Sequence, residues 1–125
     1  MTSGNWLKTL KEHTQLVYNL IKITASKFAS CSTDKTIKIW DVITGTCLKT
    51  LEGHSDSVSC LLKINQKTIA NGSCDHTIKI WDLITGVCLK TLEGHSQFVY
   101  DLIKINENKI VSCGQDKSIK TLSSD

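Results

Sequence analysis

Two stretches of this sequence are almost identical: TIKIWDVITGTCLKTLEGHS at residues 36–55 and TIKIWDLITGVCLKTLEGHS at residues 77–96. They differ at two of twenty positions and begin 41 residues apart. Two further sets of residues keep the same spacing: His13, His54 and His95; Asp34, Asp75 and Asp116. Internal repetition at a fixed period is the signature of a repeat architecture. The sequence therefore divides into three copies of a 41-residue unit, and residues 3–125 make three whole periods.

Each unit contains short runs of alternating apolar and polar residues, which are typical of β-strands. In residues 77–81, Ile78 and Ile80 fall on the same face of the expected strand. The middle unit contains four such runs: residues 57–63, 68–73, 77–81 and 87–92. Gly, Asn, Asp and Ser separate the runs and predict turns. Because no stretch has a helical apolar stripe, the sequence predicts an all-β protein.

The middle unit carries Gly53-His54, then Asp75 in an expected turn, then Trp81-Asp82. These motifs, at about 40 residues per unit, resemble the WD-repeat β-propeller family, in which each unit supplies a four-stranded blade. The first unit departs from the pattern with Glu12-His13, and the third departs from it with Leu122-Ser123. The resemblance implies an N-terminal outer strand followed by three blades, at residues 5–10, 16–51, 57–92 and 98–122.

Composition restricts the classes of function. The net charge is +3, and the fifteen basic residues are all lysines. Most of them recur once per unit, as solvated strand positions do, whereas phosphate and guanine recognition favours the arginine fork. The sequence therefore predicts protein contacts rather than nucleic-acid binding. No apolar run reaches the roughly 18 residues of a membrane span, so we expect no membrane association and a cytoplasmic location, with the nucleus as an alternative.

Six cysteines lie at positions 31, 47, 60, 74, 88 and 113. Cys47 and Cys88 occupy one repeat position, and Cys31 and Cys113 occupy another. Because this spacing follows the repeat and includes no C-x-x-C pair, it indicates packed thiols rather than a disulfide framework or a zinc site. We expect neither a metal nor another cofactor.

Histidine, serine and aspartate recur together and have two interpretations. One is a Ser–His–Asp hydrolase, and the other is a structural hydrogen-bond network in every blade. Repetition favours the network, because catalysis needs one set of residues, so we expect no catalytic residue. The members that the resemblance implies are His13, Ser30, Asp34, Trp40, His54, Ser73, Asp75, Trp81, His95, Ser112 and Asp116. The identity of the hydroxyl member stays open between two registers: Ser30, Asn71 and Ser112, or Ser32, Ser73 and Gly114.

Three blades do not close a ring, since propellers typically contain four to eight. Residues 117–122 align with the third strand of a blade, and residues 5–10 align with the fourth strand at residues 46–51. We therefore expect a homodimer that forms one six-bladed propeller, in which residues 5–10 of each copy complete the last blade of the other. The residues expected to form this clasp are Trp6, Leu7, Leu10, Ile119 and Leu122. The alternatives are a fragment of a longer propeller and a vestigial structural unit.

The resemblance also implies a non-enzymatic interaction scaffold, because WD-repeat propellers mostly bind proteins or peptides around the central channel. The corresponding positions precede the first-strand valine and the turn aspartate of each unit, with two tyrosines nearby: Leu16, Ser57, Phe98, Thr33, Cys74, Gln115, Tyr18 and Tyr100. As an alternative, Leu16 and Phe98 pack against neighbouring blades or at the dimer seam. Some family members recognise phosphorylated peptides through arginines, and that role is not expected here.

Overall fold

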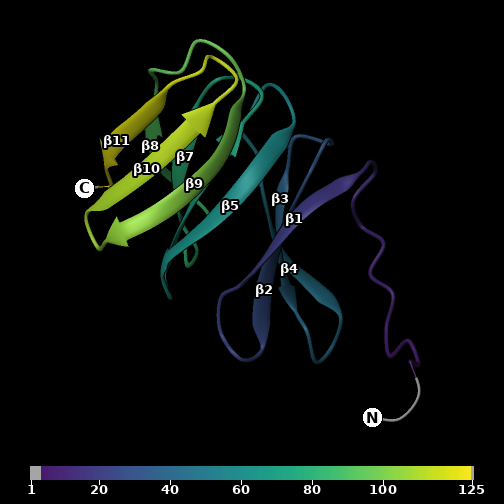
Figure 1. Ribbon diagram of the computed structural model, residues 1–125. Helices are drawn as coiled ribbons and strands as arrows, with labels where there is room; N and C mark the ends of the chain where they lie inside the picture. The colour runs from purple at the N-terminus through teal and green to yellow at the C-terminus, as the bar shows by residue number, and fades with distance from the viewer. Residues whose placement is uncertain (1–3, 125) are drawn as a thin grey trace.

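Three antiparallel β-sheets follow one another along the chain and stand side by side as blades (Figure 1). The computed structural model describes residues 4–124. The first sheet contains β1 (Val17–Lys22), β2 (Lys27–Ser32), β3 (Ile37–Asp41) and β4 (Thr46–Leu51). The second contains β5 (Val58–Asn65), β6 (Thr68–Ser73), β7 (Ile78–Asp82) and β8 (Cys88–Leu92). The third contains β9 (Val99–Asn106), β10 (Lys109–Gly114) and β11 (Ile119–Ser123). The all-β fold class predicted from the sequence is confirmed.

Consecutive strands pair in every sheet, so each blade is a meander of hairpins. Within residues 4–124 the third sheet has three strands, and β11 is its edge. In the first two sheets a fourth strand, β4 or β8, pairs with the strand that corresponds to β11. Over the same residues the structure has no helix with the length and apolar character that crossing a membrane requires.

Residues 5–10, which the sequence analysis expects to pair with a second copy, form no strand in the single chain. They run beside the first sheet, at the opposite end of the molecule from β11 (Figure 1). Trp6 is 92% exposed and Leu7 is 87% exposed. A β-strand needs the backbone of a neighbouring strand as its hydrogen-bond partner, and the free edge that matches these residues in the repeat lies on the far blade.

The apolar core lies between the blades, in two clusters. One cluster joins the first sheet to the second and contains Ile23, Ala29, Cys31, Ile37, Ile39, Leu51, Val58, Leu61, Ile69 and Trp81. The other joins the second sheet to the third and contains Cys60, Ile64, Ala70, Ile78, Ile80, Val99, Leu102 and Ile110. Burial of these side chains is the main term that holds the blades together. The middle blade is covered on both faces, whereas each outer blade is covered by a neighbour on one face.

The two interfaces between blades contain the same hydrogen bond at equivalent positions of the repeat. Lys63 Nζ on β5 donates to the carbonyl oxygen of Ile23 in the first blade, at 2.6 Å. Lys104 Nζ on β9 donates to the carbonyl oxygen of Ile64 in the second blade, at 2.5 Å. Since the same positions of the repeat form the same bond twice, the blades stack in one register.

Candidate functional site

A hydrogen-bond network in the first blade ties the loop before β1 to the sheet. His13 Nδ1 lies 2.8 Å from Asp34 Oδ2, and His13 Nε2 lies 2.6 Å from Ser30 Oγ. Trp40 on β3 donates its indole N–H to the same serine oxygen at 2.8 Å. An indole N–H can only donate, so Ser30 Oγ accepts from Trp40 while it also lies within hydrogen-bond distance of the imidazole. One hydroxyl thus bridges the ring of His13 to the indole.

The second blade builds the same network with an amide in place of the hydroxyl. Asn71 Nδ2 donates to His54 Nε2 at 2.7 Å, while Asn71 Oδ1 accepts from Trp81 Nε1 at 2.8 Å. His54 Nδ1 lies 2.6 Å from Asp75 Oδ2. An amide offers a donor and an acceptor at once, so Asn71 bridges the ring to the indole as serine does in the first blade.

Ser73, which the sequence analysis named as a member of the network while leaving the register open, therefore lies outside the ring-to-indole bridge. Its hydroxyl donates to the carbonyl oxygen of Ser57 at 2.8 Å and accepts the backbone N–H of Asp75 at 3.0 Å. The physical reason is distance along the strand. Two residues of a strand span about 6.6 Å, which places Ser73 at the turn and Asn71 beneath the ring of His54.

The third blade has the network without its indole. His95 Nε2 lies 2.7 Å from Ser112 Oγ, and His95 Nδ1 lies 3.0 Å from Asp116 Oδ2. Leu122 occupies the repeat position of the tryptophan and has no N–H to donate. The register with Ser30, Asn71 and Ser112 is thus the one that the structure brings against the three histidines.

Hydrogen bonds keep the carboxylates of the networks ionised. Burial alone would raise the pKa of Asp34, but the hydrogen bonds from Thr36 and then from His13 lower it to about 2. The same arrangement lowers the pKa of Asp75 to about 2 against the effect of burial, and hydrogen bonds also lower the pKa of Asp116. A carboxylate that accepts several bonds in its charged form favours that form.

In the first and third blades serine, histidine and aspartate contact one another as they do in a Ser–His–Asp triad, but the serine is buried where a substrate cannot reach it. Ser30 is 3% exposed and Ser112 is 1% exposed. A nucleophile must reach the reacting atom, and these hydroxyls lie inside the sheets. The second blade has no hydroxyl at this position at all, because Asn71 occupies it. The chemistry that the networks can perform is to hold a loop on a strand.

The described residues contain no group of three or more His, Cys, Asp or Glu side chains that could hold a metal ion. The six cysteines are free thiols. Burial raises the pKa of Cys31 and of Cys60 to about 12. A thiol that is ionised only at such a pH is a poor ligand and a poor nucleophile, so these two side chains act as small apolar residues of the core.

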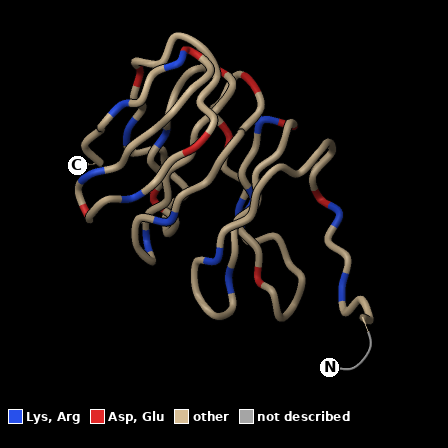
Figure 2. The backbone as a smooth tube through the Cα atoms, in the orientation of Figure 1, with Lys and Arg blue, Asp and Glu red and all other residues tan. Residues whose placement is uncertain are grey.

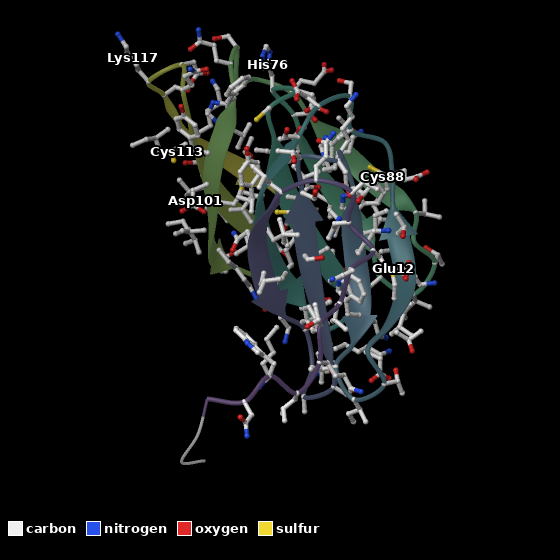
Figure 3. The ribbon with its side chains drawn as sticks, turned by 90° about the vertical axis from the view of Figure 1, so that its right-hand side faces the viewer. Glu12, His76, Cys88, Asp101, Cys113 and Lys117 are labelled. Atoms are coloured by element: carbon white, nitrogen blue, oxygen red, sulfur yellow. The ribbon has the colours of Figure 1, made fainter. Side chains whose placement is uncertain are left out.

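The positions expected to bind a partner come together in pairs at one end of each blade. The backbone N–H of Thr33 donates to the carbonyl of Leu16 at 2.9 Å. The same bond joins Cys74 to Ser57 at 2.9 Å and Gln115 to Phe98 at 2.8 Å. His76 and Lys117, which follow the turn aspartates, lie at this end of the molecule in Figure 3. The structure thus places all six of these predicted positions on one side, which we call the turn end.

Large apolar side chains are exposed at and beside the turn end. Leu16 is 69% exposed, Phe98 is 37% exposed, and Tyr18 and Tyr100 are 54% and 55% exposed. The ring of His76 lies 6.5 Å from the ring of Phe98. The sequence analysis did not single out His76. The sequence signal that could have found it is its place directly after the turn aspartate Asp75; the backbone there has a positive φ of 79°, and the residue is exposed.

Charge does not single out any one of the three blades. Lysine and acidic residues are interspersed on all three sheets (Figure 2). A uniform mixture of both signs produces no strong local field. The exposed apolar side chains are therefore the more specific surface feature.

The family model described as "WD domain, G-beta repeat" matches residues 4–41, 45–82 and 86–121. The chain belongs to the WD40 repeat family. Among solved structures it is similar to the "Crystal structure of WD40 beta propeller domain of Doa1", with a TM-score of 0.86 and 35% sequence identity. The similarity covers 92% of this chain and 39% of that one, so the chain spans well under half the length of the propeller that it matches. A comparison with curated proteins finds no match.

Each WD40 match runs across a blade boundary. The segment 45–82 begins with the outer strand β4 of the first blade and ends with β7 of the second. The first match, 4–41, contains residues 5–10 at the place of that outer strand. WD40 propellers generally serve as non-catalytic interaction scaffolds.

Proposed function

We propose that this WD40 chain is a non-enzymatic scaffold that binds a protein or peptide at the turn end. The observation that supports the proposal is the use of the polar residues. The repeated His, Asp, Ser or Asn, and Trp side chains bond to one another inside the blades, while apolar residues such as Leu16 and Phe98 face solvent. Exposed aromatic and aliphatic side chains are the usual anchors of protein interfaces.

The proposed partner surface contains Leu16, Tyr18, Thr33, Ser57, Cys74, Phe98, Tyr100 and Gln115. A protein partner is favoured over nucleic acid, because fifteen lysines without an arginine offer no bidentate recognition of phosphate or guanine. We place the scaffold in the cytoplasm, since its six cysteines are free thiols, as is usual in a reducing compartment.

Affinity capture with tagged wild-type protein and with Phe98→Ala tests the partner surface. We expect Phe98→Ala to lose a partner that the wild type and Gln66→Ala retain, with the solution mass of all three proteins unchanged. Gln66 is an exposed residue of the β5–β6 turn, which makes it a suitable control. A change of solution mass in Phe98→Ala would instead place this ring in the assembly of the scaffold itself.

We further propose that two copies of the chain associate head to tail into one closed six-bladed propeller. Val17 and Leu20 are 50% and 60% exposed on the first blade, whereas Val58 and Leu61, at the same repeat positions, are 0% and 5% exposed. Ile119 on the third blade is 77% exposed. The outer faces of the arc thus consist of the residue types that are buried between blades, and each face has its natural partner on a second copy.

Sedimentation equilibrium tests this assembly. We expect a mass of twice 13.9 kDa at micromolar concentration. A folded species of 13.9 kDa at that concentration would rule out the closed dimer.

A second candidate is that the chain is one part of a larger propeller. The observation that favours it is that three blades cover 39% of the matched Doa1 propeller chain. In that case the outer faces are covered by further WD40 repeats. The expected result is then a monomer that aggregates or recruits other propeller chains, and not a defined dimer.

A further inference from the structure

Residues 5–10 repeat the sequence of an outer strand. Gly4, Leu7, Lys8, Thr9 and Leu10 recur as Gly45, Leu48, Lys49, Thr50 and Leu51, and again as Gly86, Leu89, Lys90, Thr91 and Leu92. In β4 and β8 these residues pair with the third strand of their own sheet. Residues 5–10 therefore have the sequence of an outer strand, although they form no strand in the single chain.

The segment already lies where the outer strand of a preceding blade would lie. A β-carbon at Gly86 of the second blade would be 3.7 Å from Leu51 Cδ2, on the outer strand of the first blade. A β-carbon at Gly45 of the first blade would be 3.1 Å from Leu10 Cδ2. Leu10 also lines a hollow on the open face of this blade with Phe28 and Trp40. The first blade thus holds Leu10 as the second blade holds Leu51.

The edge strand of the third sheet is β11, which pairs with β10 within the described residues. Figure 3 shows Asp101 and Cys113 of the same sheet on its outer side, away from the middle blade. Lys38 and Lys79, at the repeat position of Lys120, donate to Thr50 and Thr91 across the sheet at 2.9 Å. Lys120 has the matching threonine, Thr9, in the N-terminal segment and not in its own sheet.

The large and the small residue of one cross-strand pair are interchanged between the completed blades and the two ends of the chain. On the third and fourth strands, Trp40 pairs with Cys47, and Trp81 pairs with Cys88. Trp81 and Cys88 also belong to the same apolar cluster, so both side chains face the neighbouring blade. At the corresponding positions the chain has Leu122 and Trp6. At this position the first two blades have tryptophan on the third strand and cysteine on the fourth. The third blade has the smaller residue on its third strand, and the tryptophan lies in the segment that matches a fourth strand.

We propose that β11 is the docking edge for residues 5–10 of a second copy, with Trp6 of one copy packed against Leu122 of the other. The repeat defines the register of the new pair of strands: Leu10 opposite Ile119, Thr9 opposite Lys120, Lys8 opposite Thr121, and Trp6 opposite Leu122. This inference rests on the proposed head-to-tail dimer and adds the residues that give it specificity. A blade with tryptophan on its third strand has a small residue opposite, whereas Trp6 requires the leucine that β11 provides. Volume-matched pairs are tolerated in a core, and mismatched pairs are not.

Leu7 is not part of this contact, although the sequence analysis placed it in the clasp. Its repeat equivalents Leu48 and Leu89 are 44% and 57% exposed on the completed blades. Both outer strands shift register at this point, which leaves the leucine without a residue opposite. Leu7→Ala is therefore a control variant within the same segment.

Sedimentation of four proteins under reducing conditions tests the pair. Trp6→Cys leaves a gap at both junctions of the dimer, and we expect the dissociation constant to rise about 100-fold or more, at roughly tenfold per lost aromatic contact. Leu122→Trp places two indoles opposite each other and should weaken the dimer as well. The double variant Trp6→Cys/Leu122→Trp recreates the pair found in the second blade, so we expect it to regain wild-type affinity. Leu7→Ala should change the constant by less than about threefold.

Mixing the two single variants identifies the second copy as the partner. In a heterodimer of Trp6→Cys with Leu122→Trp, one junction has the cysteine–tryptophan pair and the other has the native tryptophan–leucine pair. We therefore expect the equimolar mixture to dimerise with wild-type affinity, although each variant alone does not. Circular dichroism of each variant confirms that the blades are folded.

Each outcome has one meaning. A monomeric wild type overturns the proposed dimer itself. A dimeric wild type with unaffected single variants leaves the dimer standing and overturns the Trp6–Leu122 contact. A double variant that recovers while the mixture does not would show that the segment docks within its own chain, and the inference would then be wrong.

Discussion

The side-chain nitrogen of Asn71 lies 2.7 Å from Nε2 of His54, at the place where the first and third blades have a serine hydroxyl. Two different side chains thus perform one task. Each side chain lies within hydrogen-bond distance of the imidazole, and in the first two blades it also accepts the indole N–H of Trp40 or Trp81. Asn71 is fully buried, so its replacement should lower the free energy of unfolding by a measurable amount.

Replacement of Asn71 by alanine should leave the indole N–H of Trp81 and the ring nitrogen of His54 without partners. An unsatisfied buried polar group costs about 1–3 kcal/mol, and we expect the free energy of unfolding to fall by at least that amount. Asn71→Ser should lose less, because serine forms this bridge in the first blade. Urea denaturation at one fixed protein concentration measures the difference, with Gln66→Ala as the surface control. Equal losses for the two Asn71 variants would contradict the bridging role.

The histidines of the second and third blades should differ in their effect on stability. His54→Ala breaks a network that includes the indole of Trp81, whereas His95→Ala breaks one in which Leu122 replaces the indole. We expect His54→Ala to lower the melting temperature more than His95→Ala does. Thermal melting followed by circular dichroism decides this, and an equal or reversed order would show that the indole does not strengthen the network.

The stability of the fold should depend on the turn carboxylates in acid. The pKa of Asp75 is about 2 in the folded chain, against a reference value of 3.8. A lowered folded pKa means that the contribution to stability is complete above about pH 4 and is lost as the pH falls toward 2. Asp75→Asn should be less stable than the wild type at neutral pH, and the difference should shrink in acid. Melting curves between pH 7 and 2, with Glu52→Gln as an exposed control, provide the test.

Thiol reactivity should separate the buried cysteines from the one at the open face of the arc. Burial raises the pKa of Cys31 and of Cys60 to about 12, so we expect alkylation at neutral pH only after unfolding. Cys113 lies on the outer side of the third sheet (Figure 3). It should react in dilute solution and become protected at concentrations where the proposed dimer forms. Mass spectrometry of iodoacetamide-treated protein, with and without denaturant, reports all three sites, and rapid alkylation of Cys60 in the folded chain would contradict its place in the core.

Much of the fold could be predicted from the sequence, because the information is local. Strand alternation, the turn residues and the 41-residue period are properties of adjacent residues and of their copies. They predicted an all-β chain, and the resemblance to the WD-repeat family implied propeller blades; the structure and the family match confirm both. The family resemblance named Thr33, Leu16, Gln115 and Phe98 as contact positions, and the structure shows that each turn lies against the first strand of its own blade.

Three features depended on the tertiary structure. The choice of Asn71 over Ser73 depends on where the loop carrying His54 crosses the sheet, and two candidates on one strand cannot be separated by spacing alone. The exposure of Leu48, on which we base the proposal that Leu7 lies outside the clasp, accompanies a register shift between paired strands. Whether residues 6–10 form a strand depends on which backbone lies beside them. Sequence periodicity determines what a segment is able to form, while the arrangement of neighbouring strands in space determines whether a partner is there.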